Sequence, residues 1–208
     1  MIYFVETPWW LRKLYRNCVW KMPGNEKIIY LTFDDGPHPI ATPYVLDTLS
    51  KYQATATFFC IGKNVVQEPD LYKKIIEAGH AVGNHTFNHL NGWKTAGSDY
   101  LHDIREAKRY IDSNLFRPPY GRISRFQLKR LSTESYKLAT IMWTVLSGDF
   151  DTALSKEKCL QNVLINSGSG SIVLFHDSEK AYERMAYALP EVLEYFSKKG
   201  YRFDKIVV

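Results

Sequence analysis

The sequence contains little cysteine and no cysteine pair at redox or metal-binding spacing. Its three cysteines, Cys18, Cys60 and Cys159, lie far apart, and no Cys-x-x-Cys occurs in the 208 residues. An odd number of widely separated cysteines is typical of free thiols in a reducing compartment. We therefore expect no disulfide framework.

Long hydrophobic runs are also missing. No stretch approaches the length of a membrane-spanning helix, and residues 1–17 have neither the basic leader nor the long apolar core of a signal peptide. We therefore expect a cytoplasmic protein, with export by another route as an open alternative. No linker, internal repeat or serine-centred elbow motif is present, which argues against a multidomain chain and against a serine esterase.

Charge of one sign does not dominate. The net charge is +5, with 27 Lys and Arg against 22 Asp and Glu, and no basic run exceeds a few residues. Because no nucleic-acid-binding motif accompanies the positive charge, we interpret it as solvated surface and expect no nucleic-acid partner. The sequence gives no prediction of the oligomeric state.

The chain is long enough for one domain with a full hydrophobic core, 45% of its residues being hydrophobic. We divide it into an N-terminal arm, residues 1–26, and a catalytic domain, residues 27–208. Trp9, Trp10, Leu14 and Cys18 of the arm can share one apolar face, which predicts that the arm packs on the domain. The alternative, less favoured, is that this aromatic and basic segment contacts a membrane surface.

Apolar, strand-like runs alternate with helical patterns along almost the whole chain. This alternation predicts an α/β fold with parallel strands, in which most strands are covered on both faces. The count of about seven fits a distorted (β/α) barrel or an open doubly wound sheet. The predicted strands are 28–33, 55–61, 80–84, 115–117, 136–143, 171–176 and 201–208.

The helices between these strands have readable starts. We expect the side chains of Thr42, Ser98, Ser124 and Ser155 to cap the first turns of four helices. The last helix, roughly 181–199, contains Pro190, which should kink it or split it in two.

Polar side chains gather at the carboxyl ends of the predicted strands. In a barrel of parallel strands all these ends open onto one face, where active sites are built. Five separate polar signals at such ends therefore predict a single site. They are Asp34 and Asp35, His85 and His89, Arg117, Asp149, and His176.

Two of these signals together suggest a metal centre. His85 and His89 are four residues apart, so they project the same way from a helix or turn. Two imidazoles and one carboxylate form a ligand set that leaves positions open for water and substrate. A cation held by one aspartate would also lower the cost of burying a second one beside it.

Four ordered motifs carry a family resemblance: "TFDDGP" at 32–37, "HTFNH" at 85–89, "RPPYG" at 117–121 and "LFH" at 174–176. Together they resemble the polysaccharide deacetylase family, which is carbohydrate esterase family four. The resemblance covers residue 27 to the C-terminus. It implies a distorted barrel of seven strands, a divalent metal that is usually zinc, a carbohydrate substrate, and removal of N- or O-acetyl groups from sugars.

The resemblance also implies a role for each matching residue. Asp34 would be the general base, held by Arg117, and His176 the general acid, tuned by Asp149. Tyr120 would offer its backbone N–H to the oxyanion and Leu174 would help form a pocket for the acetyl methyl group. The implied metal ligands are Asp35, His85 and His89.

The chain departs from the family in one motif. The family usually has Asp-x-x-Asp-Trp where this chain reads "LSGDF", so Leu146 replaces an aspartate and Phe150 replaces the tryptophan. We keep the mechanism but transfer no substrate preference. Trp143 is expected as a wall of the site, and Trp93 is a candidate platform for a sugar ring. Two alternatives stay open: a deacylase or deformylase of another N-acyl substrate, which could be lipid-linked, and a catalytically silent carbohydrate-binding module.

Overall fold

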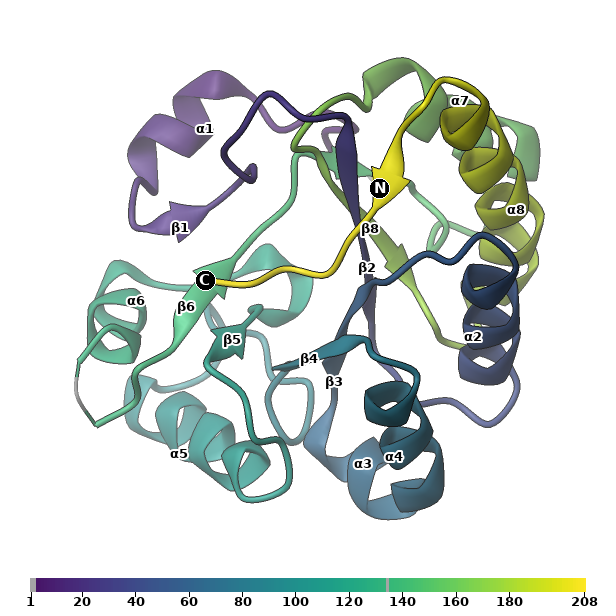
Figure 1. Ribbon diagram of the computed structural model, residues 1–208. Helices are drawn as coiled ribbons and strands as arrows, with labels where there is room; N and C mark the ends of the chain where they lie inside the picture. Colours follow the sequence, from purple (N-terminus) through teal and green to yellow (C-terminus); the bar gives the residue numbers. More distant parts are fainter. Residues whose placement is uncertain (1–2, 134) are drawn as a thin grey trace.

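The computed structural model describes residues 3–133 and 135–208 (Figure 1). Nine short strands and eight α-helices alternate along these residues. The strands are β1 (Cys18–Val19), β2 (Ile28–Asp34), β3 (Thr57–Cys60), β4 (Ala81–Asn84), β5 (Leu115–Phe116), β6 (Ala139–Ile141), β7 (Val145–Leu146), β8 (Ile172–His176) and β9 (Arg202–Phe203). The helices are α1 (Trp9–Leu14), α2 (Ala41–Lys51), α3 (Gly62–Gln67), α4 (Pro69–Glu77), α5 (Gly97–Lys108), α6 (Arg125–Leu131), α7 (Lys156–Asn166) and α8 (Tyr182–Lys198), with a 3₁₀ turn, η1, at Pro119–Gly121.

The strands form one curled, parallel sheet surrounded by helices. Its order is β1-β6-β5-β4-β3-β2-β8-β7, and β9 pairs with the start of β2. This arrangement confirms the predicted α/β fold with a distorted barrel. All seven predicted strands are present, although the predicted 136–143 and 201–208 shorten to β6 and β9. The two-residue strands β1 and β7 were not predicted.

The N-terminal arm bridges the two ends of the sheet. The carbonyl of Val5 accepts a hydrogen bond from Leu146 N–H of β7 (2.8 Å), and Thr7 N–H donates to Thr144 (2.9 Å). Farther along the arm, β1 pairs with β6 at the opposite end. Without the arm the sheet would run from β6 to β7 and stay open. The arm lies between these two end strands and closes the barrel.

One detail of the arm differs from the prediction. Cys18 is buried, but Trp9, Trp10 and Leu14 are exposed, so these three side chains do not pack on the domain. The reason is that the opposite side of α1 faces inward, where Leu11 packs against the buried cluster around Cys18.

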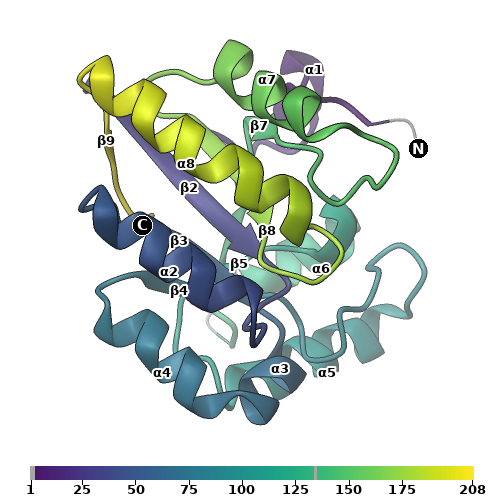
Figure 2. The same ribbon diagram turned by 90° about the vertical axis from the view of Figure 1, so that its right-hand side faces the viewer.

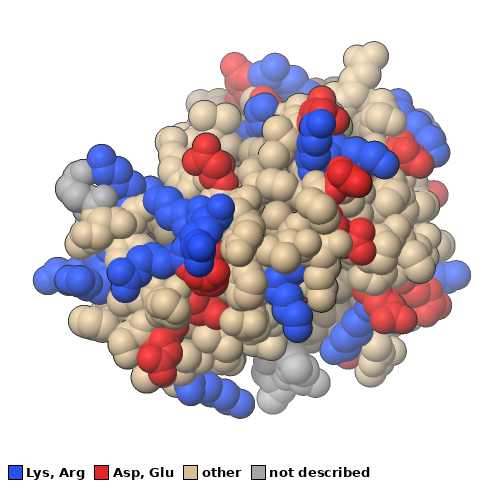
Figure 3. Space-filling model, turned by 90° about the horizontal axis from the view of Figure 1, so that it is seen from below, with Lys and Arg blue, Asp and Glu red and all other residues tan. Residues whose placement is uncertain are grey.

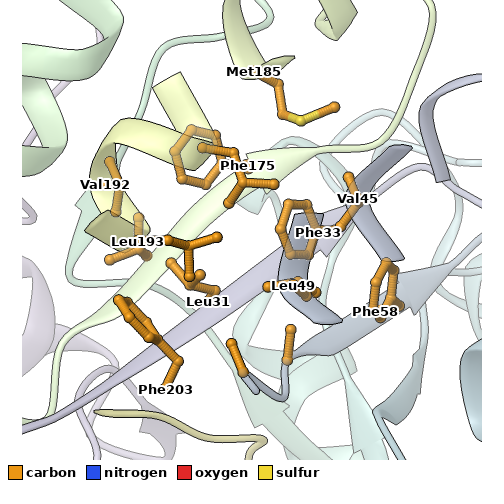
Figure 4. Packing of buried hydrophobic residues seen from close by; sticks show 14 of the residues in the cluster. Leu31, Phe33, Val45, Leu49, Phe58, Phe175, Met185, Val192, Leu193 and Phe203 are labelled. Atoms are coloured by element: carbon orange, nitrogen blue, oxygen red, sulfur yellow. The ribbon is translucent and has the colours of Figure 1, made fainter. Parts of the chain in front are cut away.

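The main core lies between the sheet and helices α2 and α8. Phe33 of β2 is stacked between Phe58 of β3 (ring centroids 5.1 Å apart) and Phe175 of β8 (6.1 Å). Figure 4 shows these rings beside Leu49 of α2 and other apolar side chains of both helices. Because alternate residues of a strand face opposite ways, Phe33 anchors β2 in this core while Asp34 faces the other side. The core thus fixes the strand that carries the two aspartates.

Two of the four predicted helix caps are confirmed. Ser124 forms a capping box with Gln127 at the start of α6, and Ser155 Oγ accepts a hydrogen bond from Lys158 N–H. Thr42 and Ser98 do not cap their helices, which begin one residue earlier, at Ala41 and Gly97.

The longest helix, α8, has 17 residues and continues through Pro190 without being split. It ends at Lys198, just before Gly200, which has a positive φ of 76°. Within residues 3–133 and 135–208, no helix combines the length and the apolar character needed to cross a bilayer.

Candidate active site

The carboxyl ends of the central strands bring the predicted polar residues together. Asp34 is the last residue of β2 and stands directly opposite His176, the last residue of β8, in the parallel ladder. Figure 2 shows these two strands side by side and pointing the same way. His85 immediately follows β4, and its N–H donates to Cys60 at the end of β3 (2.9 Å). The edge of the sheet thus gathers residues that are far apart in the sequence.

Asp35, His85 and His89 form a compact cluster of potential metal ligands. One ligand atom of each lies within 4.8 Å of the others. Oδ1 of Asp35 is 3.1 Å from Nε2 of His89 and 3.7 Å from Nε2 of His85. These distances leave room for one ion between three donors, so the structure brings the predicted ligand set together.

The protonation of His85 suits a metal ligand. Its Nδ1 is 2.8 Å from the carbonyl oxygen of Arg117, which can only accept, so Nδ1 carries the proton and Nε2 presents a lone pair to the site. Burial lowers the pKa of His85 to about 4, so the ring is neutral at pH 7.

The surroundings of Asp35 Oδ1 show whether these three residues suit a cation. Oδ1 is buried with no hydrogen-bond partner among the described residues, and the lone pair of His85 Nε2 faces it at 3.7 Å. A buried carboxylate oxygen facing an imidazole lone pair is a repulsive arrangement unless a cation lies between them. The residues present therefore fit a divalent cation.

Arg117 is fully buried, and the hydrogen bonds that its guanidinium donates hold it in place. Its Nη1 donates to Oδ1 of Asp34 (2.8 Å) and to Oγ1 of Thr32 (2.7 Å). Its Nε and Nη2 donate to the carbonyls of Ile141 (3.1 Å) and Met142 (2.9 Å). The predicted Arg117–Asp34 pair is thus present, and the buried carboxylate has a fixed counter-charge. Thr32 was missed, although it lies two residues before Asp34 on the same side of β2.

His176 and Asp149 form a second buried pair. Nδ1 of His176 donates to Oδ1 of Asp149 (2.7 Å), and the His176 backbone N–H donates to Oδ2 (2.7 Å). Burial lowers the pKa of His176, but the Asp149 charge and hydrogen bond outweigh it and raise the pKa to about 9. Arg184 Nε donates to the Asp149 carbonyl (2.7 Å) and steadies this loop. Nothing in the sequence signals the role of Arg184, which lies on α8.

The motif at residues 146–150, which departs from the family, still packs against His176. The Phe150 ring stands edge-on to His176, with centroids 5.3 Å apart, and contacts the Tyr3 ring of the arm at 5.2 Å. Leu146 is buried and lies beside Leu174 in the ladder between β7 and β8. An apolar wall therefore replaces the family's aspartate next to the site.

Of the three predicted substrate contacts, Tyr120 touches the ligand cluster, whereas Leu174 and Trp143 lie near His176 and Arg117. The Tyr120 hydroxyl is 3.1 Å from Nδ1 of His89, so its side chain orients a ligand, which sequence reasoning missed. Leu174 is buried two residues before His176 on the same face of β8. Trp143 is partly buried between two core clusters, 5.9 Å from the Arg117 guanidinium.

Backbone strain is concentrated here. Among the described residues, six that are not glycine have a positive φ, and four of them belong to these motifs: Asp35, Thr86, His89 and Tyr120. The left-handed region costs about 1–2 kcal/mol for such residues and persists where the surroundings enforce it. Asn64 Nδ2 donates to the Asp35 carbonyl (2.7 Å) and holds one of these turns.

Asp177 is a further residue that sequence reasoning missed. Its Oδ1 accepts the Gly36 N–H (3.0 Å) and its Oδ2 accepts the Thr42 hydroxyl (2.5 Å), so it ties the aspartate turn to β8. This bond explains why Thr42 does not cap α2. Burial raises the pKa of Asp177 to about 8. Its position directly after His176 was the available signal.

Comparisons with known proteins agree with the geometry. The sequence profile of the polysaccharide deacetylase family matches residues 21–139. A peptidoglycan-N-acetylglucosamine deacetylase of Bacillus cereus is 40% identical over 190 residues, covering 88% of each chain. A chitooligosaccharide deacetylase of Azorhizobium caulinodans is 36% identical over 164 residues, covering 76% of this chain and 77% of its relative.

A solved structure matches over nearly the whole chain. It is a peptidoglycan N-acetylglucosamine deacetylase in complex with a naphthalenyl N-oxidanyl-benzamide, with a TM-score of 0.86 and 31% identity. The match covers 96% of this chain and 95% of the other. The N-terminal arm therefore lies largely within the matched region.

Proposed function

The chain belongs to the polysaccharide deacetylase family, and from this premise we propose that it is a metal-dependent hydrolase. It removes N-acetyl groups from the amino sugars of a polymer or oligosaccharide such as peptidoglycan or chitooligosaccharide. The observation that carries the proposal is that three units lie together at one edge of the sheet. They are the ligand cluster Asp35, His85 and His89, the pair Asp34–Arg117, and the pair His176–Asp149.

Asp35, His85 and His89 would hold the metal. We propose zinc, because two imidazoles and a carboxylate suit it and leave positions open. When bound, such an ion lowers the pKa of its water and polarises the substrate carbonyl. Tyr120 and the Arg117 carbonyl orient the two rings through their Nδ1 atoms.

Asp34 is the proposed general base. Arg117 occupies its Oδ1, whereas its Oδ2 lies 3.8 Å from Nε2 of His85 and so faces the ligand cluster. Oδ2 is thus the atom placed to accept a proton from the attacking water. Because Arg117 is fixed by four hydrogen bonds, Asp34 needs no reorganisation during this transfer.

His176 is the proposed general acid. An amine cannot leave as an anion, so a group must protonate it as the carbon–nitrogen bond breaks. Asp149 keeps Nδ1 of His176 protonated and favours the imidazolium, which leaves Nε2–H to donate to the leaving nitrogen. The Tyr120 N–H would stabilise the developing oxyanion, while Leu174 and Trp143 would bound the space for the acetyl group.

Two alternative functions make different demands on these groups. A catalytically silent carbohydrate-binding module would not need the base or the acid, yet Asp34 and His176 each keep a buried charged partner. This observation favours an enzyme. Hydrolysis of another N-acyl or N-formyl bond uses the same groups and is separated only by the choice of substrate.

The test is acetate release from chitooligosaccharides and from peptidoglycan fragments by zinc-loaded protein. We expect release that stops when a chelator removes the metal and returns when zinc is restored. The matched control is Asp34→Asn, which should bind zinc like the wild type but lose nearly all turnover, because the ligand cluster is intact. Release of formate instead of acetate from matched N-formyl sugars would support the alternative. Carbohydrate binding without any product would support the silent module.

A further inference from the structure

The outer side of α1 exposes an unusual group of large apolar side chains. Their exposed fractions are 57% for Phe4, 74% for Trp9, 49% for Trp10 and 49% for Leu14. We call these four residues the aromatic surface. Single exposed apolar residues are common, but a contiguous group on one short segment marks an interaction site.

The geometry of α1 shows that these residues form one face. Trp9, Trp10 and Leu14 occupy positions i, i+1 and i+5, which lie within about 140° of one another on a helix. The opposite face is already used, because Leu11 and Tyr15 pack against the buried cluster beneath the arm. The helix is therefore apolar on both sides, and only one side is covered within the described residues.

Two rings of this surface contact each other. Phe4 and Trp10 contact each other edge to face, with centroids 6.4 Å apart, although they come from different parts of the arm. Figure 1 shows α1 at the periphery of the molecule, with no other helix on its outer side. The aromatic surface thus faces outward as a preformed unit.

Positive charge is concentrated in the same segment. Residues 1–21 contain four basic residues and one acidic residue, a net +3 of the whole chain's +5. The single acid, Glu6, pairs with Arg12 at 3.6 Å, whereas Lys13 and Arg16 are exposed beside the aromatic surface. Lys13 shares the outward face of α1 with Trp9. By contrast, the face seen from below in Figure 3 intersperses basic and acidic side chains.

We propose that the aromatic surface docks the protein on an anionic lipid membrane. Trp and Phe rings favour the boundary between headgroups and acyl chains, and neighbouring lysine and arginine side chains are attracted to anionic headgroups. An exposed apolar face flanked by an excess of positive charge matches a bilayer surface, which is broad and negatively charged. The protein lies on the membrane through α1 and does not span it.

The test is co-sedimentation of the full chain with vesicles of phosphatidylcholine alone or with 30% phosphatidylglycerol. We expect binding to the anionic vesicles that weakens as salt screens the charge. Trp9→Gln together with Trp10→Gln should lower the partition coefficient at least tenfold, because both rings are lost from the interface. Lys13→Gln together with Arg16→Gln should lower it about 30-fold, at about one decade per 1.4 kcal/mol and about 1 kcal/mol for each basic residue.

The matched control is Phe126→Gln, since Phe126 is 61% exposed but lies on α6, outside the arm. It should bind vesicles like the wild type, and circular dichroism should show the same fold for all variants. The proposal is wrong if anionic vesicles bind no better than neutral ones, or if the Trp9 and Trp10 variant binds like the wild type. Dimerisation that the same two substitutions abolish would mean that a second copy covers the surface, which also overturns it. Because binding is measured without substrate, the result does not depend on the deacetylase activity.

Discussion

The pair His176–Asp149 gives the sharpest prediction for a single substitution. In Asp149→Asn the residue keeps its size, but the negative charge that faces Nδ1 of His176 at 2.7 Å is removed. Burial lowers the pKa of His176, and the largest effect that opposes burial is then lost, because Asp35 and Asp34 raise this pKa less than Asp149 does. The pKa should therefore fall from about 9 toward the ordinary value of about 6.5.

The size of the effect follows from the fraction of imidazolium. At pH 7.5 a group with a pKa of about 9 is almost fully protonated, whereas one with a pKa of about 6.5 is only about 9% protonated. A general acid must carry its proton, so kcat/KM at pH 7.5 should fall, by as much as about tenfold if the pKa reaches about 6.5. A bound dication repels the imidazolium in both proteins and lowers both values, so the difference between the two profiles is the quantity to measure.

The assay is acetate release from a chitooligosaccharide between pH 5.5 and 10. The wild type should show a bell-shaped kcat/KM profile, and its alkaline limb should move to lower pH in Asp149→Asn, by up to about two units. Asp151→Asn is the control, because it makes the same substitution two residues away, where the carboxylate contacts Tyr3 and not His176. An alkaline limb that stays in place in Asp149→Asn would refute the assignment of His176 as the acid.

Three further predictions concern neighbouring groups. Arg117→Met leaves Asp34 buried without its counter-charge, so urea unfolding should show a loss of about 3–5 kcal/mol; unchanged stability would contradict this. Gly36→Ala would place a Cβ 2.0 Å from Oδ2 of Asp177, so its Tm should drop sharply, whereas Gly168→Ala, with open space around it, should unfold like the wild type. Trp93 is held by its indole N–H on the Ile123 carbonyl (3.0 Å) and stacks with Arg122, so Trp93→Ala should raise KM for oligosaccharides at constant kcat; an equal loss of kcat would exclude a purely binding role.

The raised pKa of His176 determines how this residue makes the stability of the fold depend on pH. Because the folded-state pKa of His176 is raised to about 9, its pair with Asp149 stabilises the protein fully below pH of about 6.5. This contribution is lost as the pH rises from there through about 9. His85 acts in the opposite sense, since its pKa is lowered to about 4 and the folded state loses stability as the pH falls toward that value.

The position of the site could be predicted because it follows from topology. Parallel strands place their carboxyl ends on one edge, so Asp34, His85 and His176 had to meet once the strands were identified. The hydrogen-bonding partners of these residues could be predicted only in part from the sequence. The pairs with Arg117 and Asp149 followed from the family motifs, whereas Arg184 acts from a helix far along the sequence and carried no local signal.

The arm and the caps show where pattern alone fails. The aromatic residues of α1 have helical spacing, but periodicity does not say which of two apolar faces is turned inward, and Leu11 and Tyr15 take that side. Thr42 has the residue type of a cap, yet its hydroxyl donates to Asp177 across the site. In its place, Nδ1 of His38 accepts the Ala41 N–H (3.2 Å) at the start of α2. Tertiary contacts overrode the local preference in both places.

The most direct measurement is anomalous scattering recorded on both sides of the zinc absorption edge, from crystals grown with zinc. A single strong peak should lie about 2.0–2.2 Å from an oxygen of Asp35 and from Nε2 of both His85 and His89. It should vanish in crystals of the double variant His85→Ala and His89→Ala. No peak at this cluster under saturating zinc, or a peak that persists in the variant, would contradict a metal centre at the core of this account.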